Sequence, residues 1–396
     1  MNRRLLVLNV YFAPRSFGGA TIVAEELVKN LQSDNRWEVV VVTTFHDPSV
    51  APYCLRRYKA SGINIVGINI PEYVTDREQY SNPNVDEIIF DVVDIFEPHL
   101  MHVHSIQRLG CGYFEGIKKR NIPFVVTVHD CWWICEKQFM VASDNRYCFQ
   151  EKIEVDRCRY CVDDVNQFRR RDKFLKEKLR LANRLLFPSD FQRNLYLKNG
   201  FDPERCLVNK NGVMLPGSAY AKTRKHDAGP VVFGFVGGPG PIKGSDVMLK
   251  AFNKIKHSDY KLFIVDAAKN VGSTWVDRHN WKIPGELEFV EPYTQDTMDQ
   301  FFSSIDVLIF PSQWKESFGL VVREALSRDV WVIASEAGGV VEDLVDGVNS
   351  SVIPLDGDYR RLAVELVECM GREWSGYQNP CRQQIRGYKE QADELR

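Results

Sequence analysis

Two carboxylates eight positions apart give the clearest chemical signal in the sequence. Glu316 comes just before, and Glu324 lies inside, the segment 319–328, whose apolar spacing predicts a helix. A carboxylate suits the vicinal hydroxyls of a sugar because each of its oxygens can accept two hydrogen bonds. Helical geometry allows at most about 12 Å between the two positions, similar to the span from ribose to hexose in an extended nucleotide sugar. The alternative is an anion that favours the helix dipole, together with a surface glutamate.

A lysine beside a glycine suits phosphate binding. Lys243 and Gly244 follow the predicted strand 231–238 and stand at the start of a predicted helix, 244–256. A lysine and the free N–H groups of a helix start can hold a phosphate together, and one charge-assisted contact contributes about 1.5–3 kcal/mol. A solvated surface lysine is the alternative.

Two motifs in the first half of the chain also follow predicted strands. Gly18 and Gly19 precede the predicted helix 20–31, where backbone N–H groups could approach an anion, although an ordinary tight turn also needs glycine. His129 lies at the end of the predicted strand 122–130. A histidine there could bind a sugar hydroxyl or handle a proton, and a satisfied buried histidine is the alternative.

Five of the ten cysteines fall within residues 131–161. Two of them are separated by only two residues, a spacing typical of zinc ligands. The four candidate ligands of a structural zinc are Cys135, Cys148, Cys158 and Cys161. Cys131 is an alternative upstream ligand, and free thiols are the other interpretation, since disulfides need an oxidising setting that the sequence does not indicate.

The elements that would position these residues alternate between strands and helices along the chain. Ten mostly near-continuous apolar runs predict strands at 5–11, 37–44, 62–70, 99–105, 122–130, 231–238, 261–267, 286–293, 306–312 and 330–335. Such runs are typical of parallel strands that helices cover on both faces. Ligands of these sheets bind outside the carboxyl ends of the strands, and every motif above follows a strand.

The sequence therefore predicts an α/β fold of two Rossmann-like, doubly wound domains that face a central cleft. We expect a first domain at 1–214 with the cysteine-rich insert at about 131–161, a linker at 215–230, a second domain at 231–371, and a terminal segment at 372–396 that packs back on the first domain. The length of 396 residues fits two domains.

Composition and charge restrict the function classes. A formal net charge of -2 gives no attraction to nucleic acid. The start, MNRRLLVLNVYFAP, predicts a first strand better than a signal peptide, and no run approaches the ~20 apolar residues that span a bilayer. We expect a cytoplasmic protein. The segment 168–180 is rich in Lys and Arg and could rest on an anionic membrane at its inner face through Phe168, Leu175 and Leu179, with a solvated helix as the alternative.

On these residues the chain resembles the retaining GT-B glycosyltransferases of the family-four group, over nearly all of both domains. The most specific element is the E-x7-E pattern of Glu316 and Glu324. Asn211–Gly212–Val213 and Lys243–Gly244 also match the family's motifs, whereas Gly237–Gly238 stands where members commonly carry Gly-Arg.

The resemblance implies roles for the site residues. Glu324 would bind the ribose hydroxyls of the donor, and Glu316 would contact the donor sugar. His129 would approach the transferred sugar. The implied catalytic residues are Glu316, His129 and Lys243; the implied donor-binding residues are Gly18, Gly19, Lys243, Glu316, Ser317, Phe318, Gly319, Leu320 and Glu324.

The expected reaction moves a sugar from a UDP- or GDP-sugar donor to a glycan or lipid-linked acceptor in polysaccharide, lipopolysaccharide or glycolipid biosynthesis. Backbone N–H groups and Lys243 would stabilise the leaving diphosphate, so catalysis would need no metal or other cofactor. The family resemblance favours front-face attack with retention. Two alternatives are a non-hydrolysing nucleotide-sugar epimerase, which needs no acceptor, and a non-catalytic nucleotide-sugar-binding protein.

Overall fold

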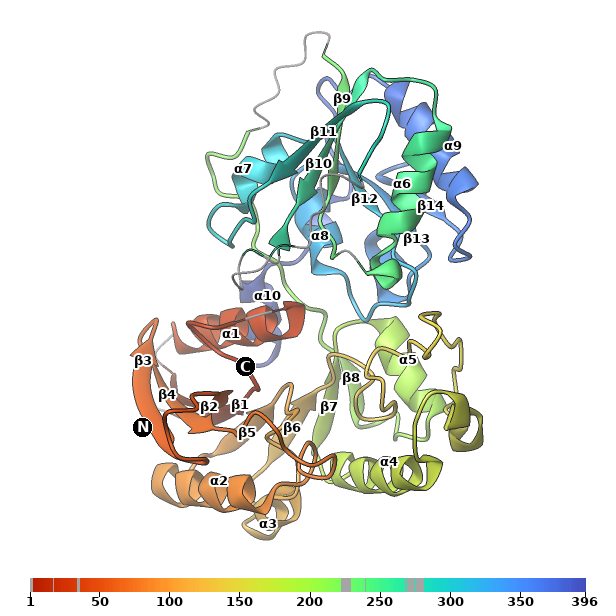
Figure 1. Cartoon of the computed structure of the whole chain (residues 1–396). Helices are drawn as coiled ribbons and strands as arrows, with labels where there is room; N and C mark the ends of the chain where they lie inside the picture. Colours follow the sequence, from red (N-terminus) through yellow and green to blue (C-terminus); the bar gives the residue numbers. More distant parts are fainter. Residues whose placement is uncertain are drawn as a thin grey trace. The chain divides into compact units, whose positions relative to one another are not determined.

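The computed structural model describes residues 3–16, 18–33, 36–221, 229–238, 240–267, 269, 274 and 281–396. The chain divides into two compact units (Figure 1). Unit 1 comprises Met1–Met140, Phe149–Gly212 and Tyr388–Arg396, and unit 2 comprises Val141–Cys148 and Val213–Gly387. Residues 222–228 of the predicted linker lie outside the described residues.

Unit 1 contains an eight-stranded sheet in the order β3-β4-β2-β1-β5-β6-β7-β8. Its strands are β1 Arg3–Leu8, β2 Trp37–Phe45, β3 Leu55–Ala60, β4 Ile63–Asn69, β5 Leu100–Val103, β6 Phe124–Thr127, β7 Arg184–Phe187 and β8 Cys206–Val208. Neighbouring strands are parallel except for the antiparallel pair of β3 and β4. The chain builds outward from β1 in one direction and then restarts at β5 on its other side.

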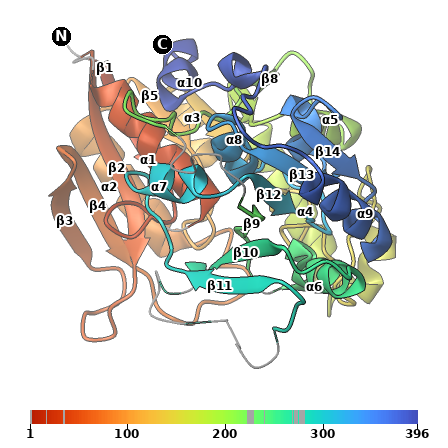
Figure 2. The same ribbon diagram turned by 90° about the horizontal axis from the view of Figure 1, so that it is seen from above.

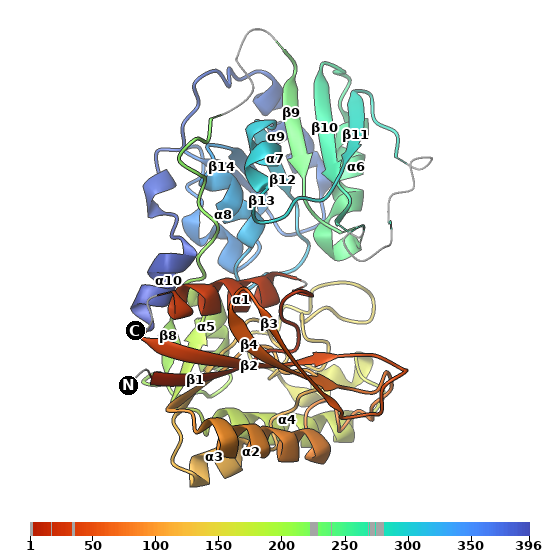
Figure 3. The same ribbon diagram turned by 90° about the vertical axis from the view of Figure 1, so that its left-hand side faces the viewer.

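Helices cover both faces of this sheet, as Figure 3 shows. They are α1 Gly19–Gln32, α2 Pro83–Phe96, α3 Phe114–Lys119, α4 Val165–Leu179, α5 Asp190–Lys198 and α10 Tyr388–Glu394, with a 3₁₀ helix at Val155–Tyr160. On the face that α1 covers, apolar side chains alternate along the strands, as with Leu5 and Val7 of β1. They pack against Leu27 and Leu31 of α1 and against Ala392 of α10. Every second side chain of a strand thus faces the apolar side of a helix.

Unit 2 contains a six-stranded sheet, entirely parallel, in the order β11-β10-β9-β12-β13-β14. Its strands are β9 Val231–Phe235, β10 Tyr260–Val265, β11 Glu286–Val290, β12 Val307–Phe310, β13 Trp331–Ser335 and β14 Ser350–Ile353. The chain runs outward from β9 to β11 and then restarts at β12 on the other side of β9. The space between β9 and β12 is therefore the point at which the strand order reverses.

The helices of unit 2 also lie on both faces of its sheet (Figure 2). They are α6 Ser245–Lys254, α7 Met298–Ser303, α8 Leu320–Leu326 and α9 Tyr359–Met370, with 3₁₀ helices at Pro241–Lys243, Gly339–Asp343 and Arg382–Gln384. Phe233 and Phe235 of β9 pack in the core beneath α6 and α9. Val232, which alternates with them, packs in the core beneath α7 and α8.

The prediction of two Rossmann-like α/β domains is confirmed. The terminal segment returns to unit 1 only from Tyr388 onward, because Gly387 still belongs to unit 2. Among the helices of the described residues, none combines the length and the apolar character that crossing a membrane requires.

Candidate functional site

The candidate donor-binding residues of unit 2 lie where its strand order reverses. Lys243 follows β9, and Glu316 lies between β12 and α8. Because β9 and β12 are parallel neighbours, the loops at their carboxyl ends leave the same edge of the sheet side by side. Open α/β sheets bind ligands at this position.

Lys243, Glu316 and Ser312 form one polar cluster. The Lys243 ammonium lies 2.9 Å from Oε1 of Glu316, and the Ser312 hydroxyl donates to the same oxygen at 2.8 Å. The Glu316 side chain is 12% exposed and that of Lys243 is 31% exposed, so the pair is shielded on the carboxylate side and open on the ammonium side. The structure thus brings together two residues that the sequence predicted and adds Ser312.

Glu316 lies outside helix α8, in an extended stretch that pairs with Gly338. Its backbone N–H donates to the Ala337 carbonyl at 3.1 Å, and the Gly339 N–H donates to the Glu316 carbonyl at 2.9 Å. Since α8 begins only at Leu320, the helical rise does not set the separation of Glu316 from Glu324, and the estimate of about 12 Å was wrong in its premise.

Arg323 fixes the loop that carries the predicted sugar-binding backbone, residues 316–320. Its guanidinium donates to the Phe318 carbonyl, to the Gly339 carbonyl at 2.7 Å and to Asp343 at 2.7 Å. It also lies 4.1 Å from the centre of the Phe318 ring. Arg323 is 1% exposed, so it connects two loops from inside unit 2 and does not present its charge to a ligand.

Gly244 is required by a close backbone approach. Its φ is +74°, and a Cβ atom there would lie 1.9 Å from the Pro311 carbonyl oxygen. The absence of a side chain lets the start of α6 meet the end of β12. This contact holds the Lys243 and Glu316 loops against each other, which explains why the sequence places glycine directly after the lysine.

Glu324 lies in α8 and is 3% exposed. Burial raises the pKa of its carboxyl group to about 7, although the Arg328 guanidinium and the side chains of Gln295 and Tyr293 lower it in part. Oε1 of Gln295 is itself buried without a hydrogen-bond partner among the described residues. A buried carboxyl group with a strongly raised pKa beside an unsatisfied polar atom is typical of a functional site.

Sequence reasoning missed four residues of this site. Ser312 and Arg323 lie within a few residues of Glu316 and Glu324 in the sequence, but their contacts depend on how the loop folds back. Tyr293 and Gln295 follow β11, so the rule that ligands lie after strands could have found them. The remaining predicted loop residues, Ser317, Gly319 and Leu320, are half-buried, and Phe318 is buried.

The predicted residues of unit 1 occupy the corresponding edge of its sheet. Gly18 caps the start of α1 with a φ of +82°, and Gly19 is the first helical residue. His129 follows β6 and is buried, and its Nε2 lies 3.0 Å from Nδ1 of His104. Burial lowers the pKa of His129 to about 4, so this side chain is neutral at neutral pH.

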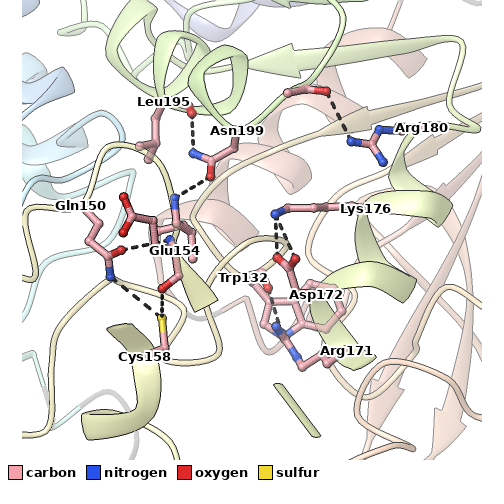
Figure 4. Close-up of polar contacts among 12 residues, drawn as sticks. Trp132, Gln150, Glu154, Cys158, Arg171, Asp172, Lys176, Arg180, Leu195 and Asn199 are labelled. Atoms are coloured by element: carbon pink, nitrogen blue, oxygen red, sulfur yellow. Dashed lines mark hydrogen bonds and ion pairs between the residues drawn. The ribbon is translucent and has the colours of Figure 1, made fainter. Parts of the chain in front are cut away.

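The cysteine-rich insert folds around polar contacts that Figure 4 shows. Gln150 donates to the Cys158 sulfur at 3.9 Å, and Oδ1 of Asn199 accepts a hydrogen bond from the Ile153 N–H at 2.8 Å. Among the described residues, which include all ten cysteines, no group of three or more His, Cys, Asp or Glu side chains is arranged to hold a metal ion. The zinc site at Cys135, Cys148, Cys158 and Cys161 stays a prediction that metal analysis of the purified protein can test.

Helix α4 corrects one expectation. Phe168, Leu175 and Leu179 are at most 1% exposed, because the apolar stripe of the helix packs inside unit 1. These side chains are therefore not available to a membrane. The basic residue Arg171 is also buried; it donates to the Trp132 carbonyl at 2.8 Å (Figure 4).

Comparison with known proteins identifies the family. The profile described as Glycosyltransferase Family 4 matches residues 17–215, and that described as Glycosyl transferases group 1 matches residues 219–370. An uncharacterized glycosyltransferase of Methanocaldococcus jannaschii is 24% identical over 92% of this chain and 88% of its own length. A D-inositol 3-phosphate glycosyltransferase of Kribbella flavida is 22% identical over 64% of this chain and 70% of its own length.

A solved structure has a similar fold. The Anabaena protein Alr3699/HepE, crystallised in complex with UDP and glucose, superposes with a TM-score of 0.66 at 16% identity, over 99% of this chain and 97% of that one. The family profile covers residues 17–215, half of the chain, and the second profile covers most of the remainder. The chain therefore belongs to glycosyltransferase family 4, within the GT-B fold.

Proposed function

We propose that this glycosyltransferase is a retaining enzyme that moves a sugar from a UDP- or GDP-sugar to a glycan or lipid-linked saccharide. The observation that carries the proposal is the contact of Lys243 and Ser312 with Glu316 at the point where the strand order of unit 2 reverses. The complex of Alr3699/HepE with UDP and glucose supports the donor class. The name of the Kribbella flavida relative makes D-inositol 3-phosphate an acceptor to include in the assay.

The donor would bind to unit 2 through two carboxylates and one ammonium group. Glu324 accepts hydrogen bonds from the ribose hydroxyls, and Glu316 accepts them from hydroxyls of the donor sugar. Lys243 supplies a positive charge to the diphosphate, and the backbone of Phe318, Gly319 and Leu320 lies along the sugar. Lys243 already contacts Glu316, so this ion pair would lie where the diphosphate of the donor meets its sugar.

In the reaction, the bond between the anomeric carbon and the phosphate oxygen breaks, and its electron pair stays with the diphosphate. Lys243 and backbone N–H groups stabilise this charge, with no step that requires a metal. The acceptor hydroxyl forms the new bond on the same face, and its proton passes to the leaving phosphate oxygen. His129 is neutral, so its role is a hydrogen bond to the transferred sugar.

The acceptor-side groups would come from unit 1. Gly18 and Gly19 at the start of α1 leave backbone N–H groups free to approach an anion. The exposed side of α4 carries Arg169, Arg170 and Lys173, which fit a weak electrostatic contact with an anionic membrane at which a lipid-linked acceptor is presented.

The enzyme assay uses a panel of UDP- and GDP-sugars with the full-length protein. Slow donor hydrolysis or transfer with an α-configured product from an α-linked donor supports the proposal. An isomerised donor would instead identify an epimerase, and donor binding without turnover would identify a binding protein.

Substitutions assign the two carboxylates. We expect Glu324→Ala to weaken donor binding by about 10-fold or more, because it removes an acceptor of two hydroxyl groups. Glu316→Ala is expected to reduce kcat mainly, since the Lys243 contact is lost with it. Glu286→Ala is the control, because Glu286 pairs with Lys261 on the surface of the same unit. Full activity in both site variants contradicts the roles assigned here.

Membrane contact is tested separately by sedimentation with liposomes. We expect binding to vesicles that contain phosphatidylserine and its loss in the triple variant Arg169→Gln, Arg170→Gln, Lys173→Gln. Binding to neutral vesicles, or charge-dependent binding that the triple variant keeps, contradicts the role of α4.

A further inference from the structure

Three histidines lie together at the ends of two neighbouring strands of unit 1. His102 is in β5, His104 follows this strand directly, and His129 follows β6. Strands β5 and β6 are parallel neighbours, so His104 and His129 lie at the same edge of the sheet, and His102 lies within β5 just before this edge. The rings of His102 and His104 are 4.0 Å apart between centres, and those of His104 and His129 are stacked at 5.3 Å.

The contact between His104 and His129 requires one donor and one acceptor. Nδ1 of His104 lies 3.0 Å from Nε2 of His129. Burial lowers the pKa of both imidazoles, so each ring is neutral at neutral pH and carries one N–H group. Either His104 donates from Nδ1, or His129 donates from Nε2.

The surroundings of His104 decide between these two cases. Its Nε2 is buried and has no hydrogen-bond partner among the described residues. If His104 accepted at Nδ1, its only proton would be on this buried Nε2, and an orphaned buried N–H group is rare in folded proteins. If His104 donates from Nδ1, its Nε2 carries only a lone pair. We therefore assign the donor to His104 and the acceptor to Nε2 of His129.

This assignment places the proton of His129 on Nδ1. That nitrogen makes no hydrogen bond within the described residues, and it is absent from the buried polar atoms that lack a partner. His129 is 7% exposed, so this N–H group remains available to a ligand that reaches the carboxyl edge of the sheet. His102 takes no part in the contact, because its Nε2 lies 2.7 Å from the Thr127 hydroxyl.

We propose that His104 is a positioning residue that fixes His129 in the Nδ1–H tautomer, so that His129 presents a hydrogen-bond donor to an oxygen of the bound sugar. His129 then acts as a donor ligand and not as a general base. The role toward the sugar rests on the proposed transferase function, whereas the tautomer itself is a property of the free protein.

The tautomer is measured by nitrogen-15 NMR of the full-length protein with labelled histidine, and His129→Gln identifies the His129 signals. We expect protonation at Nδ1 in the wild type and in His104→Asn, whose side-chain amide can donate from the position of Nδ1. His104→Leu removes the donor and should give a mixture of tautomers. The matched control is His102→Gln, which changes the same stack without touching His129 and should keep the wild-type tautomer.

Kinetics give the second readout. We expect His104→Leu to lower kcat by about tenfold or more with little change in the donor KM, and His104→Asn to recover most of the loss. Protonation of wild-type His129 at Nε2, or an unchanged tautomer and kcat in His104→Leu, overturns the inference. If His104→Leu does not fold, the wild-type tautomer and the His104→Asn variant decide the matter. If the wild-type protein shows the expected tautomer but turns over no nucleotide sugar, the tautomer stands and the proposed function is overturned.

Discussion

At the scale of single residues, the ionisation of Glu324 bears on the donor binding that we propose for unit 2. Burial raises its pKa to about 7, so its carboxyl group changes charge near neutral pH. Vicinal hydroxyls donate hydrogen bonds most strongly to the ionised form. If the donor ribose binds Glu324 as proposed, its binding is therefore coupled to the loss of a proton.

The first prediction concerns donor binding. We expect the dissociation constant of the wild-type protein for its nucleotide-sugar donor to rise as the pH falls from 8 to 6, by up to about tenfold per pH unit below the pKa. Glu324→Gln should bind more weakly and without this dependence. Calorimetric titrations at pH 6, 7 and 8 measure the effect, and equal affinity of the wild type at all three would refute the coupling. His129 does not interfere, because its pKa is about 4.

The second prediction concerns stability. The pKa of Glu324 in the folded protein lies above its usual value of 4.5, so the folded state binds more protons than the unfolded state between about pH 4.5 and 7. Ionisation of this group therefore lowers the free energy of unfolding as the pH rises through that window. From pH 4 to pH 8 the wild type should lose up to about 3 kcal/mol of unfolding free energy through this group, and Glu324→Gln should not show this loss. Urea denaturation at both pH values tests this, with Glu286→Gln as the exposed control.

At the scale of elements, the candidate donor site depends on loops whose positions are fixed by buried contacts. The Lys243 loop meets the end of β12 through Gly244, and the Glu316 loop meets the 3₁₀ helix Gly339–Asp343 through Arg323. Neither Gly244 nor Arg323 offers a group to a ligand. Their contribution is to fix the positions of residues that do.

The third prediction tests the close approach at Gly244. We expect Gly244→Ala to destabilise unit 2 by roughly 3 kcal/mol or more and to weaken donor binding, because the new methyl group collides with a backbone carbonyl. Gly347→Ala is the matched control: its φ is +75°, but nothing lies within 4 Å of the new Cβ. It should lose only the roughly 1–2 kcal/mol of a left-handed alanine. Equal losses in the two variants, measured by chemical denaturation, would show that the contact with Pro311 is unimportant.

The fourth prediction tests the Arg323 clamp. Lysine keeps the positive charge but cannot reproduce three contacts in different directions. We expect Arg323→Lys to raise the donor KM by about tenfold and to lower stability by about 2–4 kcal/mol, since it leaves buried carbonyl groups unpaired. Steady-state kinetics and thermal denaturation measure both. Arg360→Lys is the control: Arg360 is 77% exposed, so this substitution should change neither the donor KM nor the stability.

At the scale of the whole molecule, the chain leaves unit 1 after Gly212 for the long segment Val213–Gly387 of unit 2 and re-enters unit 1 at Tyr388. The returning helix α10 is joined to unit 1 by Gln391, which is 1% exposed. Its Oε1 accepts a hydrogen bond from the Gly212 N–H at 2.8 Å, and its amide donates to Asn209 at 3.3 Å. The terminal residues are therefore part of the fold of unit 1.

The fifth prediction tests this closure. Gln391→Ala leaves buried groups of Gly212 and Asn209 without a partner and should destabilise unit 1 by about 1–3 kcal/mol. The control is Lys389→Ala on the same helix, because Lys389 is exposed and pairs with Asp393 at the surface. Thermal denaturation of both variants measures the difference. A Gln391→Ala protein as stable as the control would mean that α10 contributes little to unit 1.

The sequence by itself determined the fold class and the position of the main candidate residues. Apolar runs such as 37–44 predict buried parallel strands, and a parallel sheet places every carboxyl strand end at one edge. Lys243 and Glu316 could therefore be expected to lie near each other, and they do. The hairpin strand β3 was missed, because its sequence, LRRYKA, has no apolar run and pairs only at the edge of the sheet.

Only the tertiary structure decided the protonation and the support of the site. The raised pKa of Glu324 comes from burial, the need for glycine at 244 comes from Pro311, and the tautomer that we propose for His129 depends on its contact with His104. Each involves atoms that are brought together by folding from distant segments. Periodicity and spacing describe the chain only locally. The sequence therefore predicts at which edge of each sheet the candidate site residues lie, but not which residues contact them and change their pKa or protonation.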